Sequence, residues 1–371
     1  MYTFQILHLS DLHIGVKPNV LGWPHVRRPE GNPLGKVSPL AYGSWSPEIY
    51  RCLLDEVVSP CREVLDAVLV TGDLATDGRA ADLAWAEFQI AELVKKLAGP
   101  RLTREGLTQS RDRVLIMPGN HDRYDGWFGR AGGTRFERVF TRFWPETPQP
   151  PVVQDRWRRF RELKRRVFSP GRRPRRTQTW LLECEGPSEG SSPDRLAIVA
   201  ADFTLQRSRD ASKTPMAHLG QGKAYLHVID QLKHATRAVS FETRAIVWAV
   251  HFPPEFEKND PLLALLDDGA LIDAAVELDV EHIFCGHTHE DRQYTIYRDV
   301  RHVDIHCAGT AAQCHVAPSG SNCAHPLEIT VDGGSLVGVR WFTLKWHRDF
   351  KAFLSTREVA DPPEAAWPIE L

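Results

Sequence analysis

Five short apolar runs, each followed directly by polar residues, constrain this 371-residue chain more than any other feature. Each run has the length of a strand and carries apolar residues at successive positions, which is typical of strands buried on both faces. The runs are Phe4–Leu9, Ala67–Thr71, Val114–Met117, Ala245–Val250 and Val280–Cys285. We therefore expect strands that other elements cover on both sides.

The residues that follow these runs share one chemistry: each loop brings an Asp, an Asn or a His. In chain order they are Asp11 and His13, then Asp73, then Asn120, His121 and Asp122, then His251, and finally His287 and His289. In open α/β sheets, ligands bind beyond the carboxyl ends of the strands. The repetition therefore predicts one shared site built from five loops.

Helical patterns lie between the runs, and strand-like sequence dominates the C-terminal part. Helices are predicted over Asp82–Leu97, Lys223–Ala238 and Leu262–Leu278, the last interrupted near 267–269. Later strands are predicted over Gln293–Tyr297, His302–Cys307, Leu327–Val331 and Leu336–Leu344, the last two joined by a hairpin turn at 332–334. A mixed sheet, or two packed sheets with helices outside, fits this order best.

Two segments interrupt this alternation, and we expect a single domain over 1–350 with insertions at 16–47 and 123–177 and a tail at 351–371. The first insertion is either a lid or binding loop, or a plain surface excursion. Within the second, Arg156–Lys164 has a helical pattern and Pro170–Arg176 reads as basic coil.

Composition limits the binding partners and the cellular location that we expect for the chain. The 46 basic and 48 acidic residues nearly balance, so no global field points to nucleic acid or an anionic membrane. An odd count of seven cysteines does not suggest a disulfide framework. No apolar run is long enough to span a bilayer and no signal-peptide pattern begins the chain. We expect a cytoplasmic protein with no membrane partner, and the sequence gives no oligomeric state.

Each polar position has a simpler interpretation when taken alone. Asp11, His13 and Asp73 are residue types that also serve as turn or capping residues, and a single histidine is often a satisfied core residue. Capping does not, however, call for five histidines at converging strand ends. The complete set therefore favours a chemical site.

The set resembles the calcineurin-like metallophosphoesterase superfamily, whose pattern is D-x-H, G-D, G-N-H-[D/E], H and G-H-x-H. This chain has Asp11/His13, Gly72-Asp73, Gly119-Asn120-His121-Asp122, His251 and Gly286-His287-Thr288-His289. The first and last motifs are similar to those of the branch that includes class III cyclic-nucleotide phosphodiesterases. The resemblance implies an α/β fold in four layers, an αββα sandwich of two mixed β-sheets flanked by helices.

The resemblance also implies two divalent metal ions. Asp11, His13 and His289 would bind one, Asn120, His251 and His287 the second, and Asp73 would bridge them. Carboxylate, imidazole and amide ligands suit Mn, Fe, Zn or Co. A water between the two ions would lose a proton near neutral pH and attack the phosphorus of a phosphate-ester substrate.

A second implied role concerns His121, which would protonate the leaving oxygen or stabilise the transition state. Asp122 would orient the His121 ring, in the way that carboxylates commonly orient active imidazoles. The simpler interpretation of Asp122 is a loop cap. The sequence is compatible with either role for Asp122, orienting the ring or capping the loop.

The sequence constrains the substrate class less than it constrains the metal-ligand residues. We expect a metallophosphoesterase acting on phosphodiesters, with phosphomonoesters as an alternative, and a DNA or RNA nuclease of the same superfamily or a non-catalytic scaffold module as rivals. The ten arginines within 155–176 either grip nucleic acid or form a solvated face. Steep loss of DNA affinity with salt would support the nuclease.

Four further stretches have weaker patterns. Gly220–Lys223 reads as a helix start rather than a phosphate loop. Asp202 follows a strand-like run and has a structural or indirect role. The stretch 307–312 resembles a tight loop at the floor of the site. A cluster of His and Cys residues has a structural zinc site as one interpretation, but its spacings fit no paired Cys-x-x-Cys scheme. The cluster comprises His302, His306, Cys307, Cys314, His315, Cys323 and His325.

Overall fold

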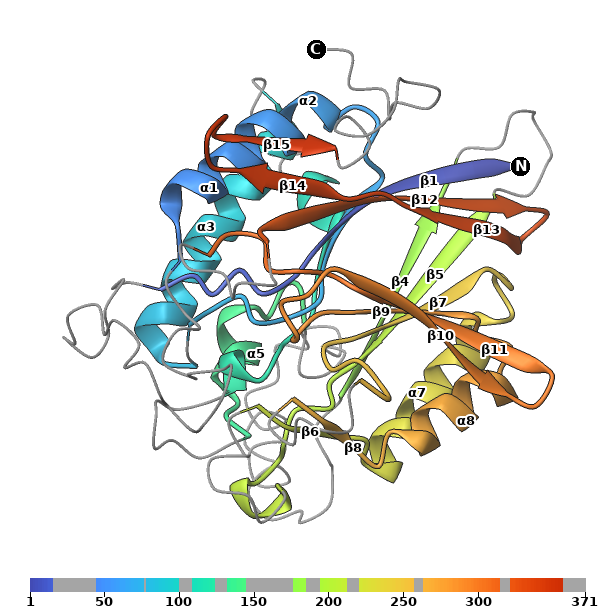
Figure 1. Ribbon diagram of the computed structural model, residues 1–371. Coiled ribbons are helices and arrows are strands. Elements are labelled where there is room, and N and C mark those ends of the chain that lie inside the picture. Colours follow the sequence, from blue (N-terminus) through green and yellow to red (C-terminus); the bar gives the residue numbers. More distant parts are fainter. Residues whose placement is uncertain are drawn as a thin grey trace, which may run out of the picture.

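A computed structural model describes residues 1–15, 45–76, 78–99, 109–123, 132–144, 176–184, 194–211, 220–256, 263–313 and 321–355. Two β-sheets pack face to face, and helices cover their outer sides (Figure 1). The layers run α, β, β, α. The α/β fold expected from the sequence is confirmed, and both sheets are mixed.

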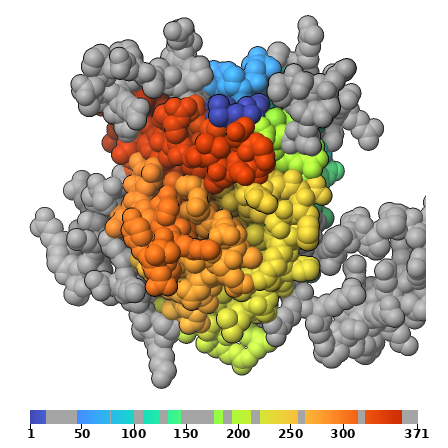
Figure 2. Space-filling view, turned by 90° about the vertical axis from the view of Figure 1, so that its right-hand side faces the viewer, coloured from blue at the N-terminus to red at the C-terminus, as the bar shows by residue number. Residues whose placement is uncertain are grey.

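The first sheet contains seven strands in the order β15-β14-β12-β1-β2-β3, with β13 also paired to β12. The strands are β1 (Tyr2–Leu9), β2 (Ala67–Val70), β3 (Val114–Ile116), β12 (Cys323–Asp332), β13 (Ser335–Trp341), β14 (Leu344–His347) and β15 (Ala352–Ser355). β1 runs parallel to β2 and antiparallel to β12. Figure 2 accordingly shows the C-terminal strands, in red, beside the N-terminal strand in dark blue.

The second sheet contains six strands in the order β10-β11-β9-β7-β5-β4. The strands are β4 (Thr177–Glu183), β5 (Arg195–Ala201), β7 (Ile246–Val250), β9 (His282–Cys285), β10 (Arg292–Arg298) and β11 (Arg301–Cys307). Its four central strands are parallel, and the two edge strands are antiparallel to their neighbours. A separate pair joins β6 (Gly222–Lys223) to β8 (Leu265–Leu266).

Helices lie on both outer sides of this sandwich (Figure 1). On the side of the first sheet lie α1 (Pro47–Cys52), the π-helical turns η2 (Leu53–Val58), α2 (Ser59–Cys61), α3 (Ala80–Ala98) and α5 (Arg135–Val139). On the side of the second lie α7 (Leu226–Val239) and α8 (Gly269–Glu277). Short 3-10 turns form η3 (His121–Arg123) and η4 (Ser208–Asp210).

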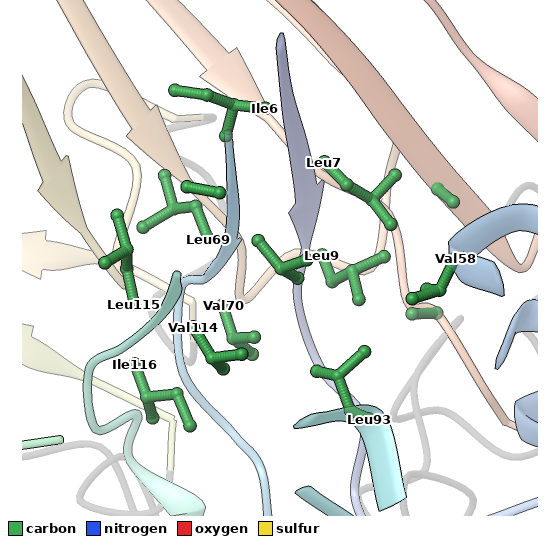
Figure 3. Packing of buried hydrophobic residues seen from close by; sticks show 14 of the residues in the cluster. Ile6, Leu7, Leu9, Val58, Leu69, Val70, Leu93, Val114, Leu115 and Ile116 are labelled. Atoms are coloured by element: carbon green, nitrogen blue, oxygen red, sulfur yellow. The ribbon is translucent and has the colours of Figure 1, made fainter. Parts of the chain in front are cut away.

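Alternation along the central strands explains why their apolar runs are continuous. On β5, Leu196 and Ile198 join the core between the sheets, whereas Val199 packs with α7 and α8. Successive side chains on a strand point to opposite faces, so a strand covered on both sides needs apolar residues at every position. Figure 3 shows the same arrangement in the first sheet, where Ile6 and Leu69 meet other buried aliphatic side chains.

Several predicted boundaries differ from the structure. The predicted helix from Lys223 begins only at Leu226, because Gly222–Lys223 pairs with β8; the interpretation of Gly220–Lys223 as a helix start is therefore corrected. The predicted helix over 262–278 is helical only from Gly269. The predicted strand Leu336–Leu344 divides into β13 and β14, which pair with different stretches of β12.

The sequence analysis missed the helical segment from Pro47 to Cys61. It begins at an N-cap in which the Ser46 hydroxyl accepts a hydrogen bond from the Ile49 amide, and Pro47 occupies the first turn, where a missing N–H costs nothing. Most of the two predicted insertions, including the predicted helix at 156–164, lies outside the described residues. β15 lies within the predicted tail and pairs with β14. Among the described residues, no helix is both long and apolar enough to cross a membrane.

Candidate metal centre

The loops after five strands meet at one end of the two sheets. β1, β2 and β3 of the first sheet lead to Asp11 and His13, to Asp73, and to Asn120. β7 and β9 of the second sheet lead to His251 and to His287 and His289. The sequence-predicted side chains therefore come together from both sheets, in the arrangement expected for the carboxyl ends of parallel strands.

The backbone at this end of the sheets is unusually strained. Five of the seven predicted ligands have a positive φ: Asp11 (53°), His13 (48°), Asp73 (51°), His287 (72°) and His289 (58°). A non-glycine residue in this region costs about 1–3 kcal/mol, and such residues concentrate at functional sites. The strain turns each side chain inward immediately after its strand.

Two glycines permit the close approach of these loops. A Cβ added to Gly119 would lie 2.2 Å from Oδ1 of Asp73, and one added to Gly286 would lie 1.8 Å from the Ser10 hydroxyl. Neither position tolerates a side chain without displacing the loop that it faces. The glycines of the G-N-H-D and G-H-x-H motifs are therefore explained by packing.

Asp11, His13 and His289 form the first candidate metal group. Nε2 of His13 and Nε2 of His289 are 3.1 Å apart, and His289 Nε2 lies 3.2 Å from Oδ1 of Asp11. That Asp11 oxygen is buried and has no hydrogen-bond partner among the described residues. Buried polar atoms are normally paired, so three converging donor atoms of this kind fit a cation.

Asp73, His251 and His287 form the second group, and Asn120 adjoins it. His251 Nε2 lies 3.3 Å from Oδ2 of Asp73 and 2.8 Å from Oδ1 of Asn120. The other ring nitrogen of His251 is 2.7 Å from the carbonyl oxygen of Thr71, to which Nδ1–H donates, so Nε2 is the ring atom that faces the centre. Both ring nitrogens of His287 are buried without a partner in the described structure.

Asp73 lies between the two groups. Its Oδ2 is 3.3 Å from His251 on one side and 3.9 Å from His13 on the other. Its Oδ1 accepts a hydrogen bond of 2.8 Å from the backbone N–H of His121. The carboxylate is thus placed to serve both groups, which is the geometry that a bridging ligand requires.

The protonation of these buried groups follows from their neighbours. Burial alone would raise the pKa of Asp73, but the surrounding histidines, His251 first, outweigh burial and hold that pKa low. Burial lowers the pKa of His13 to about 4 and that of His287 to about 3. For His251 the Asp73 carboxylate outweighs burial and raises the pKa to about 9. Because the unprotonated imidazole is the form that binds a metal ion, a bound ion would displace the His251 proton.

His121 lies beside the centre with its side chain a quarter exposed. Its Nε2 is 4.0 Å from Oδ2 of Asp73, and its ring meets that of His13 edge to face at 4.6 Å. Its Nδ1 lies 2.8 Å from the carbonyl oxygen of Thr76. The Thr76 contact therefore holds His121 at the edge of the centre, with its ligand atom within 4.8 Å of those of His13 and Asp73.

Asp122 has a different place from the expected one. Its carboxylate accepts backbone hydrogen bonds from Leu74 (3.2 Å), Ala75 (2.9 Å) and Gly119 (2.9 Å). The expectation that Asp122 orients the His121 ring is corrected, because Thr76 makes the contact at Nδ1. Asp122 caps the loop and fastens it to the Asp73 loop; burial and the Asp73 charge raise its pKa to about 7.

The loop at 307–312 supports the first group from below, as predicted. Thr310 donates its hydroxyl to the Asp11 carbonyl (2.7 Å), and the Ala311 amide donates to the Ser10 carbonyl (3.1 Å). The side chain of Asp202 does not reach the predicted ligands; it pairs with Arg123 and Arg176. Sequence reasoning missed Arg123, whose only signal is its position next to the G-N-H-D motif.

The described residues contain three groups of His, Cys, Asp and Glu that can hold a metal, and all three lie at this centre. The suspected zinc cluster near the C-terminus is not among them, and its Cys314 and His315 lie outside the described residues. Cys285 and Cys307 approach to 3.2 Å between their sulfurs, and both are free thiols.

A family model described as calcineurin-like phosphoesterase matches residues 4–291, and the chain belongs to that family. The family consists of hydrolases that act on phosphoric ester bonds and generally depend on a pair of metal ions. The chain is thus a metal-dependent phosphoesterase. No curated protein matches the chain.

The chain is also similar to several solved structures, at low sequence identity. A dimetal phosphatase from Danio rerio is 11% identical, with 91% of this chain and 98% of that chain covered and a TM-score of 0.43. The calcineurin-like phosphoesterase YfkN from Bacillus subtilis is 11% identical, with 92% and 90% covered and a TM-score of 0.40. GAP50, the anchor in the inner membrane complex of Plasmodium, is 10% identical, with 92% and 88% covered and a TM-score of 0.41.

Proposed function

We propose that the chain hydrolyses phosphodiesters with water, at a centre in which Asp73 joins two metal-binding groups. The observation that carries the proposal is the position of Asp73 between His13 and His251. Asp11, His13 and His289 would hold one divalent ion, and Asn120, His251 and His287 the other. When bound, the pair of ions would acidify the attacking water and neutralise charge on the phosphoryl oxygens.

The donor atoms support a borderline metal. Imidazole nitrogens dominate both groups, and carboxylate and amide oxygens complete them, a mixture that suits Mn, Fe, Zn or Co better than Ca or Mg. The choice among these four metals is part of the proposal, and so is the single-domain organisation with insertions at 16–47 and 123–177. The cytoplasmic location expected from the sequence stays a prediction.

His121 would act on the substrate. Because Nδ1–H donates to the Thr76 carbonyl, Nε2 carries a proton only in the doubly protonated ring. That form can donate to the leaving oxygen or to a phosphoryl oxygen above the centre. The contact with Thr76 fixes the ring so that Nε2 faces the space beside Asp73.

The preference for diesters rests on the resemblance of the first and last motifs to the cyclic-nucleotide phosphodiesterase branch. A single panel tests it: a bis-aryl phosphate, a mono-aryl phosphate, a cyclic nucleotide and single-stranded DNA, each assayed with Mn, Fe, Zn and Mg. We expect turnover of the bis-aryl phosphate to exceed that of the mono-aryl phosphate. Faster turnover of the monoester would overturn the diester proposal. Faster turnover of DNA would favour the nuclease.

The matched control for this panel is Asp73→Asn, which keeps the size of the side chain and removes its charge. Turnover that survives in this variant would come from a contaminating phosphatase. If the wild-type chain with two bound ions turned over no ester of any class, the scaffold alternative would replace the enzyme.

A further inference from the structure

Arg123 is a buried cation directly after the turn that carries Asn120 and His121. Its side chain is 1% exposed, and its guanidinium donates to Oδ2 of Asp202 at 2.6 Å, to Glu137 and to the Gly133 carbonyl. The guanidinium also lies over the Phe136 ring. Burying a charge is costly unless it is paired, and the two carboxylates of Asp202 and Glu137 pair this one.

Asp202 brings the opposing sheet to this contact. It directly follows β5, which pairs with β7, and the last residues of those strands, Ala201 and Val250, are in register. Its Oδ1 accepts from the amide and the hydroxyl of Thr204, and its Oδ2 also accepts from Arg176. Asp202 is thus held rigidly, one strand away from the strand that delivers His251.

The backbone of Arg123 closes the functional turn. Its N–H donates to the carbonyl of Asn120 at 3.1 Å, and its carbonyl accepts from the Gly133 amide at 3.0 Å. Asp122 fastens the same turn to the Asp73 loop of the first sheet. Asp122 therefore adds an attachment of the turn to the first sheet, and Arg123 adds one to the loop that follows β5 of the second sheet.

We propose that the Arg123–Asp202 ion pair is a positioning device, which spans the two sheets and fixes His121 beside the centre. Neither residue is placed to touch the substrate. The role of His121 in this inference rests on the proposed function, whereas the placement of the turn does not. An ion pair suits the task because two charges with several hydrogen bonds fix a direction as well as a distance.

The discriminating variant is Arg123→Lys, which keeps the charge but cannot reach Asp202, Glu137 and Gly133 together. We expect kcat for a bis-aryl phosphate to fall about 10- to 100-fold, since misplacement of a catalytic group by about 1 Å has effects of this size. The two bound metal ions should be retained. In a His121→Ala background, Arg123→Lys should lower kcat by less than about twofold, because the group that it positions is already gone.

Arg176→Lys is the matched control, because Arg176 shares the same Asp202 oxygen but makes no described contact with the turn. It should lower the melting temperature without the loss in kcat. Equal losses in Arg176→Lys and Arg123→Lys, or a full additional loss in the His121→Ala background, would overturn the inference. Should Arg123→Lys fail to fold, Asp202→Asn, which is nearly isosteric, takes its place with the same expected results.

A crystal structure of Arg123→Lys separates this inference from the proposed function. We expect the His121 ring to leave the Thr76 carbonyl, which its Nδ1 contacts at 2.8 Å in the wild-type chain. An unmoved turn would overturn the positioning role even in an active enzyme. A displaced turn in a chain whose wild type hydrolyses no ester would uphold the positioning role and overturn the proposed function instead.

Discussion

Oδ2 of Asp73 lies 3.3 Å from Nε2 of His251, although the two residues follow strands of different sheets. Loops of the first sheet fix both side chains: the Thr71 carbonyl accepts from His251, and the backbone amide of His121 donates to Asp73. The contact joins the two halves of the sandwich at the place where the five loops meet. The predictions for His121, Asp73 and Gly119 depend on this arrangement.

His121→Ala should keep both metal ions and lose most turnover. The ring lies beside the centre and not within either of the two proposed ligand sets, so its removal leaves the metal-binding groups in place. Removal of a general acid typically lowers kcat by about 10²- to 10⁴-fold. Metal analysis of the purified variant, together with kcat for an aryl phosphodiester, provides the measurement. Unchanged turnover would exclude the assigned role.

Metal binding should stabilise the folded chain through Asp73. A ligand at 100 times its Kd adds about 2.7 kcal/mol to the free energy of unfolding, so Mn²⁺ should raise the melting temperature of the chelated protein. Asp73→Asn should abolish most of this rise, because it removes the carboxylate shared by both groups. Thermal unfolding with and without Mn²⁺ measures the effect. An equal rise in both proteins would place the bound Mn²⁺ elsewhere.

Gly119→Ala should destabilise the fold and weaken metal binding, because it forces two backbone loops apart. The added methyl group would lie 2.2 Å from Oδ1 of Asp73, so one of the two loops must move. We expect a loss of at least about 2 kcal/mol in the free energy of unfolding, as for overpacked cores, and weaker metal binding. Gly338→Ala is the control, since nothing lies within 4 Å of its added Cβ. Similar chemical unfolding curves for both variants would contradict this packing.

Buried histidines between the sheets should make the metal-free chain sensitive to acid. Burial lowers the pKa of His306 to about 3, from an ordinary value of 6.5, and that of His325 to about 4. Below pH 6.5 the unfolded chain therefore binds protons that the folded chain does not, and stability falls as the pH falls. At about pH 5, His306 alone should account for about 2 kcal/mol of this loss.

The comparison for this prediction is His306→Phe, which keeps the ring that stacks on Phe284 and Trp341 and removes the titration. Urea unfolding of the chelated proteins at pH 7 and at about pH 5 should show a smaller pH effect in the variant. A pH effect of the same size in both proteins would show that His306 does not contribute.

The sequence predicts the parts of the fold that have a regular pattern. The five apolar runs became β1, β2, β3, β7 and β9, and the seven polar residues after them meet. The ends of buried strands can be predicted because such a strand is apolar at every position, whereas the loop that follows it contains polar residues. The helix start at Lys223 failed because a two-residue pairing with β8, formed by residues over 40 positions away, replaced the first helical turn.

Long-range hydrogen bonds also explain why the roles of Asp122 and Arg123 could not be predicted from the sequence. Asp122 lies next to His121 in the chain, yet it bonds to residues about 48 positions earlier. Arg123 appears as one more arginine until Asp202, 79 positions later, is placed beside it. Residue type and spacing therefore predicted which side chains converge, whereas the support of each loop depended on tertiary contacts.

The most direct test of the shared carboxylate is a crystal of the wild-type chain grown with Mn²⁺ and measured for anomalous scattering. We expect two peaks, about 3.5–4 Å apart, one on each side of Asp73. One peak should contact Asp11, His13 and His289, and the other Asn120, His251 and His287. A single peak, or peaks that do not contact Asp73, would contradict the proposed centre.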